Sequence, residues 1–440
     1  MHAGSRSFRR VLVLLALAAT VAGVRPSAIR AQSGDLSSDD FFSTDTLQDI
    51  QLVLNSRDWQ QLKQHYSENT YYPADLRWRD MIVRNVGIRS RGNGSRNPFK
   101  PGLKVDINRY LPNQEFLGLK SFVLDNLAQD PSMLHERLSM RFFQRMGIPA
   151  PRVTHARLSI NNEYAGLYGI TESIDKDFLR RVFGPDAHGG VENDGYLFEY
   201  RYIEQEEPFL FSYLGPDLAP YARRFSPRTH ENADPETLYR PIEQMFSAVE
   251  ASSRFEFEGA MSRYLDLPTF MRQLAIENFL ADWDGILGYA GANNFYLYRF
   301  EGTMLSRFIP WDKDFTFYSP LYSVMAGIPQ NRLARAAMDL PAPYETYMRT
   351  LLEAADSAEA PAGEGNGDTP PASWLQREIA VAFEQIRDAG LADSSKSWSN
   401  DEFLKAVEGL IDFARIRSVF VRCEVYRSVD PGRVGPECRF

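Results

Sequence analysis

Strand-like and helix-like patterns occupy different parts of this 440-residue chain. Strand-like alternation of apolar and polar residues occurs at 49–55, 81–92, 103–110, 121–126, 195–202 and in a hairpin at 152–173. Helical spacing occurs early at 56–66, where Ser56 is the expected N-cap, and at 131–146, and later at 235–250, 268–281, 374–389 and 400–420. Two more strands are expected at 293–300 and 304–311. Because strands dominate the first half and helices the second, the sequence predicts an α+β fold with two lobes.

The N-terminus has the pattern of a secretory signal peptide. Arg6, Arg9 and Arg10 precede an apolar stretch at 11–24, and small residues follow up to Ala31. The apolar stretch is shorter than the roughly 20 residues that a stable transmembrane helix needs. We therefore expect residues 1–31 to be cleaved, with no stable membrane anchor, and the protein to be secreted or to reside in the periplasm or cell envelope.

The remaining chain divides by composition. Residues 32–46 are polar and acidic, as in a flexible leader, and residues 354–373 form an acidic segment rich in proline and glycine. Such a composition buries too little apolar surface to fold, so we expect 354–373 to be a disordered linker. The predicted lobes are then 47–202, which is rich in strands, and 203–440, which is mainly helical.

The charge and the cysteines limit the possible partners and the compartment. The formal net charge is −9, and removal of residues 1–31 makes it more negative, since that segment contains arginines and no acid. An acidic chain is poorly suited to nucleic acid, whose phosphates require clustered lysine and arginine. Cys423 and Cys438, the two cysteines of the chain, lie close together near its C-terminus, and export predicts a disulfide between them.

Two carboxylates stand in the apolar, aromatic run FIPWDKDFTF at 308–317. Asp312 and Asp314 are two residues apart, and an unpaired buried carboxylate is unfavourable by several kcal/mol or more. A metal ion, a basic partner or exposure on one strand face could compensate them.

A second acidic segment, ENFLADWDGILGYAGANNFYLYR, precedes that run at 277–299. Mg²⁺ binds carboxylate and amide oxygens in near-octahedral geometry, often together with phosphate. Asp284, Asn294 and Asp312 would supply such oxygens if the predicted strand pair brings them together. Acids in these positions are also common as turn formers and helix caps, so the pairs alone are weak evidence.

A glycine-rich turn joins two of the predicted strands. RGNGS, at 91–95, could place backbone N–H groups over an anionic ligand. Lys100 and Lys104 follow, and Lys104 points away from its strand neighbours Leu103 and Val105. A lysine in this position suits a phosphate, although an ordinary hairpin with exposed basic side chains has the same pattern.

Taken together, four stretches resemble the CotH family, the spore coat protein H-like atypical kinases. They are RGNGS with PGLKVDI, GIPAPR with GLYGITESIDKDFL, DWDG with NNFYLYR, and FIPWDKDFTF, and they span roughly residues 45 to 320. The resemblance implies a two-lobed, atypical protein-kinase-like fold, with a strand-rich lobe that covers the nucleotide and a helical lobe that bears the metal. It also implies ATP with Mg²⁺ or Mn²⁺ as cofactors, and a protein substrate at the cell surface or in the envelope.

The resemblance also implies roles for individual residues. Asp284 corresponds to the catalytic aspartate and Lys104 to the ATP lysine, while Asn294, Asp312 and Asp314 correspond to metal ligands. The implied nucleotide-binding residues are Arg91, Gly92, Asn93, Gly94, Ser95, Lys100, Lys104 and Glu172.

Three points of the assignment stay open. Gly94 intervenes before Ser95, and the loop between Asp284 and Asn294 is longer than the family pattern, which makes Asn293 an alternative ligand. Glu136 is a possible partner of Lys104. A non-catalytic surface or envelope assembly protein that retains the fold, and a metal-dependent phosphohydrolase, are the alternative functions.

Overall fold

The structure is a computed structural model, and it describes residues 36–184, 192–362 and 372–440. Residues 1–31, predicted as a signal peptide, and residues 32–35 of the predicted leader lie outside the described residues. The chain from Ser38 to Phe440 forms one compact unit. None of its described helices is long and apolar enough to span a membrane.

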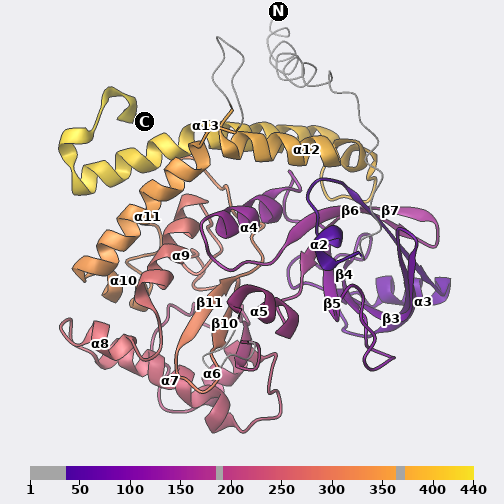
Figure 1. The fold of residues 1–440 in the computed structure, drawn as a ribbon, viewed down its shortest axis with the longest axis horizontal. Helices are drawn as coiled ribbons and strands as arrows, with labels where there is room; N and C mark the ends of the chain where they lie inside the picture. The colour runs from indigo at the N-terminus through magenta and orange to yellow at the C-terminus, as the bar shows by residue number, and fades with distance from the viewer. Residues whose placement is uncertain (1–35, 185–191, 363–371) are drawn as a thin grey trace, which may run out of the picture. The chain divides into compact units, whose positions relative to one another are not determined.

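A closed barrel of seven strands forms from the first half of this unit (Figure 1). Its order is β1-β2-β3-β4-β5-β7-β6, with β1 and β6 parallel and the other pairs antiparallel. The strands are β1 (Gln48–Leu54), β2 (Tyr72–Trp78), β3 (Met81–Arg91), β4 (Gly102–Asp106), β5 (Ser121–Asp125), β6 (Val153–Ile160) and β7 (Glu163–Glu172). Apolar side chains at every second position, such as Leu103 and Val105, fill the barrel and are fully buried.

Part of the predicted leader belongs to this barrel. Residues Ser38–Phe41 form the short helix α2, and Phe41 is fully buried. Its ring packs edge-on against Trp78, Phe116 and Phe122 at centroid distances of 5.0–5.5 Å. The polar composition of residues 32–46 predicted flexibility there, but the apolar pair Phe41 and Phe42 anchors the end of this segment.

A second, four-stranded sheet has the order β11-β10-β8-β9. It consists of β8 (Tyr196–Tyr200), β9 (Phe225–Pro227), β10 (Phe295–Arg299) and β11 (Ser306–Pro310). All its strand pairs are antiparallel. Strand β8 pairs with β10, which comes much later in the chain. The sheet therefore combines strands from both sides of residue 202.

Helices make up most of the second half. They are α6 (Ala219–Arg224), α7 (Pro235–Ala251), α8 (Phe257–Met261), α9 (Leu267–Phe279), α10 (Arg332–Met338), α11 (Pro341–Glu359), α12 (Trp374–Ala392) and α13 (Asn400–Val429). Helices α12 and α13 begin at side-chain caps, because Ser373 with Gln376 and Ser399 with Glu402 form capping boxes. Figure 1 shows α12 and α13 side by side. The mixed α+β class predicted from the sequence is confirmed.

The remaining helices lie between strands of the first half: α3 (Ser56–Gln64), α4 (His135–Arg145) and α5 (Lys176–Phe183). The N-cap of α3 is Asn55, whose Oδ1 accepts from the N–H of Arg57, and not Ser56 as expected. The predicted helix at 131–146 begins only at His135, because the carboxylate of Asp130 accepts from the N–H groups of Ser132 and His135 and forms a turn there.

Two expectations about the C-terminal part have definite outcomes. Helix α11 extends to Glu359, so residues 354–359 of the predicted linker are helical. The reason is that Ala354, Ala355 and Ala358 are small apolar residues that pack into the core. Residues 363–371 of the linker lie outside the described residues. The predicted disulfide between Cys423 and Cys438 is formed, with a Cα–Cα distance of 5.4 Å.

Candidate functional site

The first acidic loop follows α9 and ends at β10. Asn294 donates from Nδ2 to the Oδ2 of Asp284 at 3.0 Å and to its backbone oxygen at 3.2 Å. Asn293 also donates to that Oδ2, at 3.3 Å. The predicted strand pair therefore brings Asp284 to both asparagines, and the alternative between Asn293 and Asn294 stays open on these contacts.

The second acidic loop follows β11 and lies beside the first. Strands β10 and β11 are paired so that Phe295 faces Pro310, and the N–H of Trp311 donates to the backbone oxygen of Asn294 at 3.2 Å. Asn294 and Asp312 have φ angles of 56° and 51°, in the left-handed region that Asn and Asp adopt more readily than most other residues. These angles form the turns that precede β10 and follow β11.

Four carboxylates and one arginine gather at this point. We call Asp125, Glu136, Asp312 and Asp314 the acid cluster. Arg91, at the end of β3, lies 3.2 Å from Asp125 and also interacts electrostatically with Asp312 and Glu136. One guanidinium cannot neutralise four carboxylates, so the cluster carries an excess of negative charge when its members are ionised.

Burial and the neighbouring acids raise the pKa values of Glu136, Asp312 and Asp314. Burial, followed by the charges of Asp125 and Asp312, raises the pKa of Glu136 to about 8. The pKa of Asp314 lies well above its ordinary value because of burial and of Asp125, Asp312 and Glu136. Burial also raises the pKa of Asp312, against the opposing effect of Arg91.

One oxygen of the cluster has no partner. Oδ1 of Asp314 is buried, and it accepts no hydrogen bond from any described residue. The backbone of Asp314 is fixed nevertheless, because its carbonyl oxygen accepts from Nδ1 of His135 at 2.7 Å. A buried carboxylate oxygen held in place without a donor is a suitable ligand for a cation.

No group of three or more His, Cys, Asp or Glu side chains within 36–184, 192–362 and 372–440 is arranged to hold a metal ion by itself. Mg²⁺, however, is usually bound by one or two carboxylates together with substrate phosphates and water. The unpartnered oxygen of Asp314 and the charge of Asp312 fit that kind of site.

Asp284 lies near this cluster, and the charge of Asp312 acts on it. Its pKa rises to about 6, chiefly through burial and then through Asp282, while the hydrogen bond from Asn293 opposes the rise. A carboxylate with a pKa near 6 is ionised at neutral pH and retains enough basicity to accept a proton from a hydroxyl.

A buried ion-pair triad supports both loops. Nζ of Lys313 lies 2.7 Å from Oδ2 of Asp282 and 3.3 Å from Oε1 of Glu277, and all three side chains are almost fully buried. Gly285 is required beside them, because a Cβ at that position would lie 2.4 Å from Oδ2 of Asp282. Lys313 therefore stabilises the loop geometry and leaves Asp312 and Asp314 without a lysine partner.

The glycine-rich turn lies at the end of β3, next to Arg91. Gly92 has a φ of 111°, and a Cβ there would collide with Oγ of Ser95. Nδ2 of Asn126 donates to the backbone oxygens of Ser95 and Lys100 and fixes the turn. Asn93 and Gly94 lie within the turn, and the structure brings none of its side chains except that of Arg91 into the acid cluster.

Lys100 and Lys104 occupy different environments. Nζ of Lys100 is buried in an ion pair with Asp393 at 2.7 Å, so its charge is already compensated within the protein. Lys104 is half-buried on the outer face of β4 and forms no hydrogen bond or ion pair with any described residue. Burial, together with Arg89 and Arg228, lowers its pKa, as an uncompensated cation requires.

Glu172 lies in a basic cluster on β7. Its carboxylate pairs with Arg152 and Arg181 and accepts from the N–H of Arg152 at 3.0 Å. These contacts satisfy both oxygens, so the structure shows Glu172 in a structural role and does not bring it to the acid cluster.

Sequence reasoning missed Asp125 and gave Glu136 only as a possible partner of Lys104. Asp125 ends the strand SFVLD, where a buried acid after an apolar run is the same signal that singled out Asp312. Glu136 accepts from Oγ1 of Thr171 at 3.1 Å, and Arg91 is the cation that acts on its carboxylate. Lys104 pairs with Arg89 on the neighbouring strand, so it lies on the same sheet face as Arg91, which is two residues beyond Arg89.

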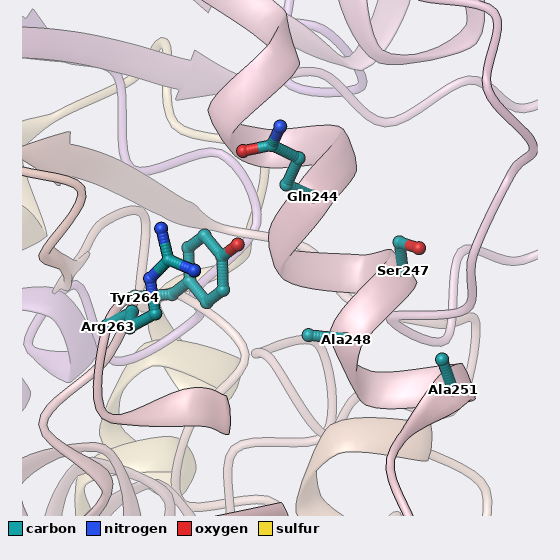
Figure 2. Close-up of a pocket in the computed structure, with 6 residues that line it drawn as sticks. All are labelled: Gln244, Ser247, Ala248, Ala251, Arg263 and Tyr264. Carbon is teal, nitrogen blue, oxygen red and sulfur yellow. The ribbon is translucent and has the colours of Figure 1, made fainter. Parts of the chain in front are cut away.

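Two surface cavities lie apart from these residues. One, of about 340 Å³, lies between α7 and the segment after α8, and Figure 2 shows Gln244, Ala248 and Ala251 on the helix with Arg263 beside the ring of Tyr264. The other, of about 400 Å³, is lined by Arg141, Gln144, Arg145 and Trp374. Neither contains a residue of the acid cluster.

Comparison with known proteins identifies the family to which the chain is similar. A family model described as CotH kinase protein matches residues 88–354, which is more than half of the chain. The inner spore coat protein H of Bacillus subtilis (strain 168) is 22% identical over 84% of this chain and 96% of its own length. Invasin CotH7 of Rhizopus delemar is 26% identical, over 42% of this chain and 30% of the invasin.

Among solved structures, the HipA, HipB and operator DNA complex of a Shewanella oneidensis MR-1 toxin–antitoxin system is similar over 85% of this chain and 74% of the other. The sequences are 11% identical, and the TM-score of 0.33 is too low to support an argument about fold or function. The matched family range of 88–354 contains the glycine-rich turn, the acid cluster and both acidic loops.

Proposed function

The chain belongs to the CotH family, and from this premise we propose that it is a kinase that transfers the γ-phosphate of ATP to a Ser or Thr hydroxyl of a protein. The supporting observation is the acid cluster, in which three of the four carboxylates are buried, the acids outnumber the single arginine, and Oδ1 of Asp314 has no partner among the described residues. The family description, which contains the word kinase, supports the same activity.

The metal fits at the junction of the two loops. Asp312, Asp314 and one of the two asparagines are the residues that would hold Mg²⁺ or Mn²⁺. When bound, the ion would neutralise charge on the ATP phosphates and so favour displacement at the γ-phosphorus. Arg91 lies beside the same acids, and its fixed positive charge is placed to meet phosphate oxygens.

Asp284 is the proposed base. The acceptor oxygen forms a bond to the γ-phosphorus, the bond from that phosphorus to the β–γ bridging oxygen breaks, and ADP leaves. Asp284 takes the proton of the acceptor hydroxyl, and the asparagine amides that bind its carboxylate hold it in position. Lys104 and the turn 91–95 are proposed to contact the nucleotide from the barrel side.

The location is part of the proposal. We infer that the predicted signal peptide exports the protein, so that it acts on a protein at the cell surface or in the envelope. The relatives named as an inner spore coat protein and an invasin agree with such a place. ATP must then reach the compartment in which the enzyme acts.

A non-catalytic coat-type assembly protein is the second candidate, and the name of the Bacillus subtilis relative favours it. Two measurements separate the two functions. Calorimetry should show that ATP binds only with Mg²⁺ or Mn²⁺ present, and radiolabelled ATP should label a protein or peptide acceptor. Equal ATP affinity with and without a chelator, or no ATP binding at all, would support the assembly protein.

A further inference from the structure

Exposed aromatic rings border Asp284. We define the ring patch as Trp283, Tyr289, Phe315, Tyr318 and Tyr322. The ring of Trp283 is central, since its centroid lies 4.8 Å from that of Tyr289, 4.9 Å from that of Phe315 and 5.8 Å from that of Tyr318. Tyr318 in turn lies 6.2 Å from Tyr322. The two acidic loops thus supply one contiguous aromatic surface.

The outer rings of this patch face solvent. Tyr289 is 77% exposed and Tyr318 is 65% exposed, and Leu321, which precedes Tyr322 in the chain, is 48% exposed. Most large apolar side chains of the described chain are buried, so several exposed ones at one place are unusual for a surface without a partner. The patch is therefore a candidate binding surface.

The backbone holds the rings in position without a ligand. The N–H of Tyr289 donates to the carbonyl oxygen of Trp283 at 3.0 Å. The N–H of Trp283 donates to the carbonyl oxygen of Phe315 at 3.4 Å. Gly291, with a φ of 96°, permits the tight return of the loop toward β10. Rings that are already ordered lose little conformational entropy on binding, which favours recognition.

The position of the patch relates it to the acceptor. Trp283 directly precedes Asp284, and Phe315 directly follows Asp314, so the patch is continuous with the proposed site of proton transfer. A protein segment that presents its hydroxyl to Asp284 must extend over the neighbouring surface. This argument rests on the proposed kinase function.

The charges around the patch determine which side chains it can select. Asp282 and Glu277 are buried and paired with Lys313, and the guanidinium of Arg417 is buried among backbone oxygens of Phe279, Pro320 and Tyr322. The ring patch itself contains no charged side chain, and the carboxylate at its border is that of Asp284. Its exposed surface consists of ring faces and phenol hydroxyls, which suit apolar and proline side chains.

We propose that the ring patch binds the acceptor protein next to the phosphorylated hydroxyl, through an aromatic or proline side chain of the acceptor. The patch then determines which hydroxyls are modified, while the acid cluster and Asp284 carry out the transfer. An apolar contact of this kind discriminates by roughly 10- to 200-fold.

The test uses peptides with a central serine and one varied flanking position. Wild-type protein with Mg–ATP should show a kcat/KM at least about tenfold higher for peptides with Phe, Tyr, Trp or Pro at one flanking position than for Ala. The double variant Tyr289→Ser/Tyr318→Ser should lose this preference through a higher KM, with the Kd of Mg–ATP unchanged. Phe255→Ser, at a residue that is 97% exposed outside the patch, is the matched control and should keep the preference.

Peptide binding without ATP separates this inference from the proposed function. If no peptide is phosphorylated but aromatic or proline peptides bind to wild type and not to the double variant, the kinase function fails and the ring patch stands. If peptides are phosphorylated without an aromatic or proline preference, or with a preference that the double variant keeps, the kinase function stands and the inference is overturned. A preference for Lys, Arg, Asp or Glu would also overturn it.

Discussion

Nζ of Lys313 lies 2.7 Å from Oδ2 of Asp282, although Lys313 stands in the chain between Asp312 and Asp314. The lysine also binds Glu277 at 3.3 Å, and these pairs connect the second acidic loop to α9 and to the first acidic loop. Because its positive charge is used there, Asp312 and Asp314 have no lysine partner, and their oxygens remain for another cation. One buried side chain thus both fixes the two loops and leaves the acid cluster uncompensated.

Removal of that lysine should destabilise the fold. Lys313→Met leaves Asp282 and Glu277 buried without a counter-charge, and breaking a buried pair in this way costs about 3–5 kcal/mol. Urea unfolding should show this loss of free energy of unfolding. The triple variant Lys313→Met/Asp282→Asn/Glu277→Gln removes the unpaired charges as well and should recover a large part of it. An unchanged stability of Lys313→Met would contradict the triad.

Substitution of an acid of the cluster, unlike substitution of Lys313, should remove activity without destabilising the fold. Asp312→Asn should abolish phosphotransfer and the stabilisation by Mg–ATP, with an unchanged or higher Tm of the free protein because one of several like charges is gone. For wild type, Mg–ATP at about 100 times its Kd should add about 2.7 kcal/mol. Asp284→Asn should lose transfer and keep most of this stabilisation. Thermal unfolding with and without Mg–ATP measures the Tm of each variant and its stabilisation by the nucleotide. If neither Asp312→Asn nor Asp284→Asn folds, the two acids are structural.

The raised pKa of Glu136 gives a pH-dependent stability. Its carboxyl holds a proton in the folded protein up to a pKa of about 8, whereas the unfolded chain releases it near 4.5. Between these values unfolding releases this proton, so stability falls progressively as the pH rises from about 4.5 to about 8. Glu136→Gln should gain Tm relative to wild type across this window, and the gain should level off above it.

That comparison requires buffers without divalent cations and a matched control. Glu163→Gln, at an exposed position of the β6–β7 hairpin, changes the same group without touching the cluster. If the difference in Tm between Glu136→Gln and wild type is the same at pH 5 and pH 9, Glu136 does not carry the proton.

The two lysines near the glycine-rich turn should differ in their effects. Lys100→Met breaks a buried pair with Asp393 and should lower the free energy of unfolding by about 3–5 kcal/mol. Lys104→Met should leave the free energy of unfolding close to that of wild type, since the charge of Lys104 has no bonded partner among the described residues. The same variant should bind Mg–ATP more weakly. Urea unfolding and ATP calorimetry on the pair of variants measure both. Stronger destabilisation by Lys104→Met than by Lys100→Met would reverse these roles.

Proton transfer to Asp284 predicts the pH dependence of the rate. The base must be ionised, so kcat/KM should fall about tenfold per pH unit below the pKa of about 6 and reach a plateau above it. Asn293→Ala removes a hydrogen bond that lowers this pKa, so the midpoint should move to higher pH. A profile that is flat from pH 5 to pH 8, or an unshifted midpoint in Asn293→Ala, would argue against Asp284 as the base.

Local patterns were sufficient for much of the architecture. Alternation predicted β3, β4, β5 and the β6–β7 hairpin, and it predicted that Lys104 faces away from Leu103 and Val105, which the structure buries inside the barrel. The positions of both acidic loops were also readable, because a helix end and a strand pair bring Asp284, Asn294 and the start of the second loop together. Periodicity and capping act over a few residues, so the sequence determined these features by itself.

Only the tertiary structure decided which charges meet. Lys100 and Asp393 are separated by 293 positions along the chain, and nothing local distinguishes Lys100 from Lys104 as a nucleotide ligand. Asp125 and Glu136 come from different elements and reach Asp312 only when the barrel closes against α4 and the second sheet. Since the free energy of a charge depends on burial and on neighbours supplied by distant segments, the partners of Arg91, Lys313 and the acid cluster were fixed by packing, and with them the chemistry of the site.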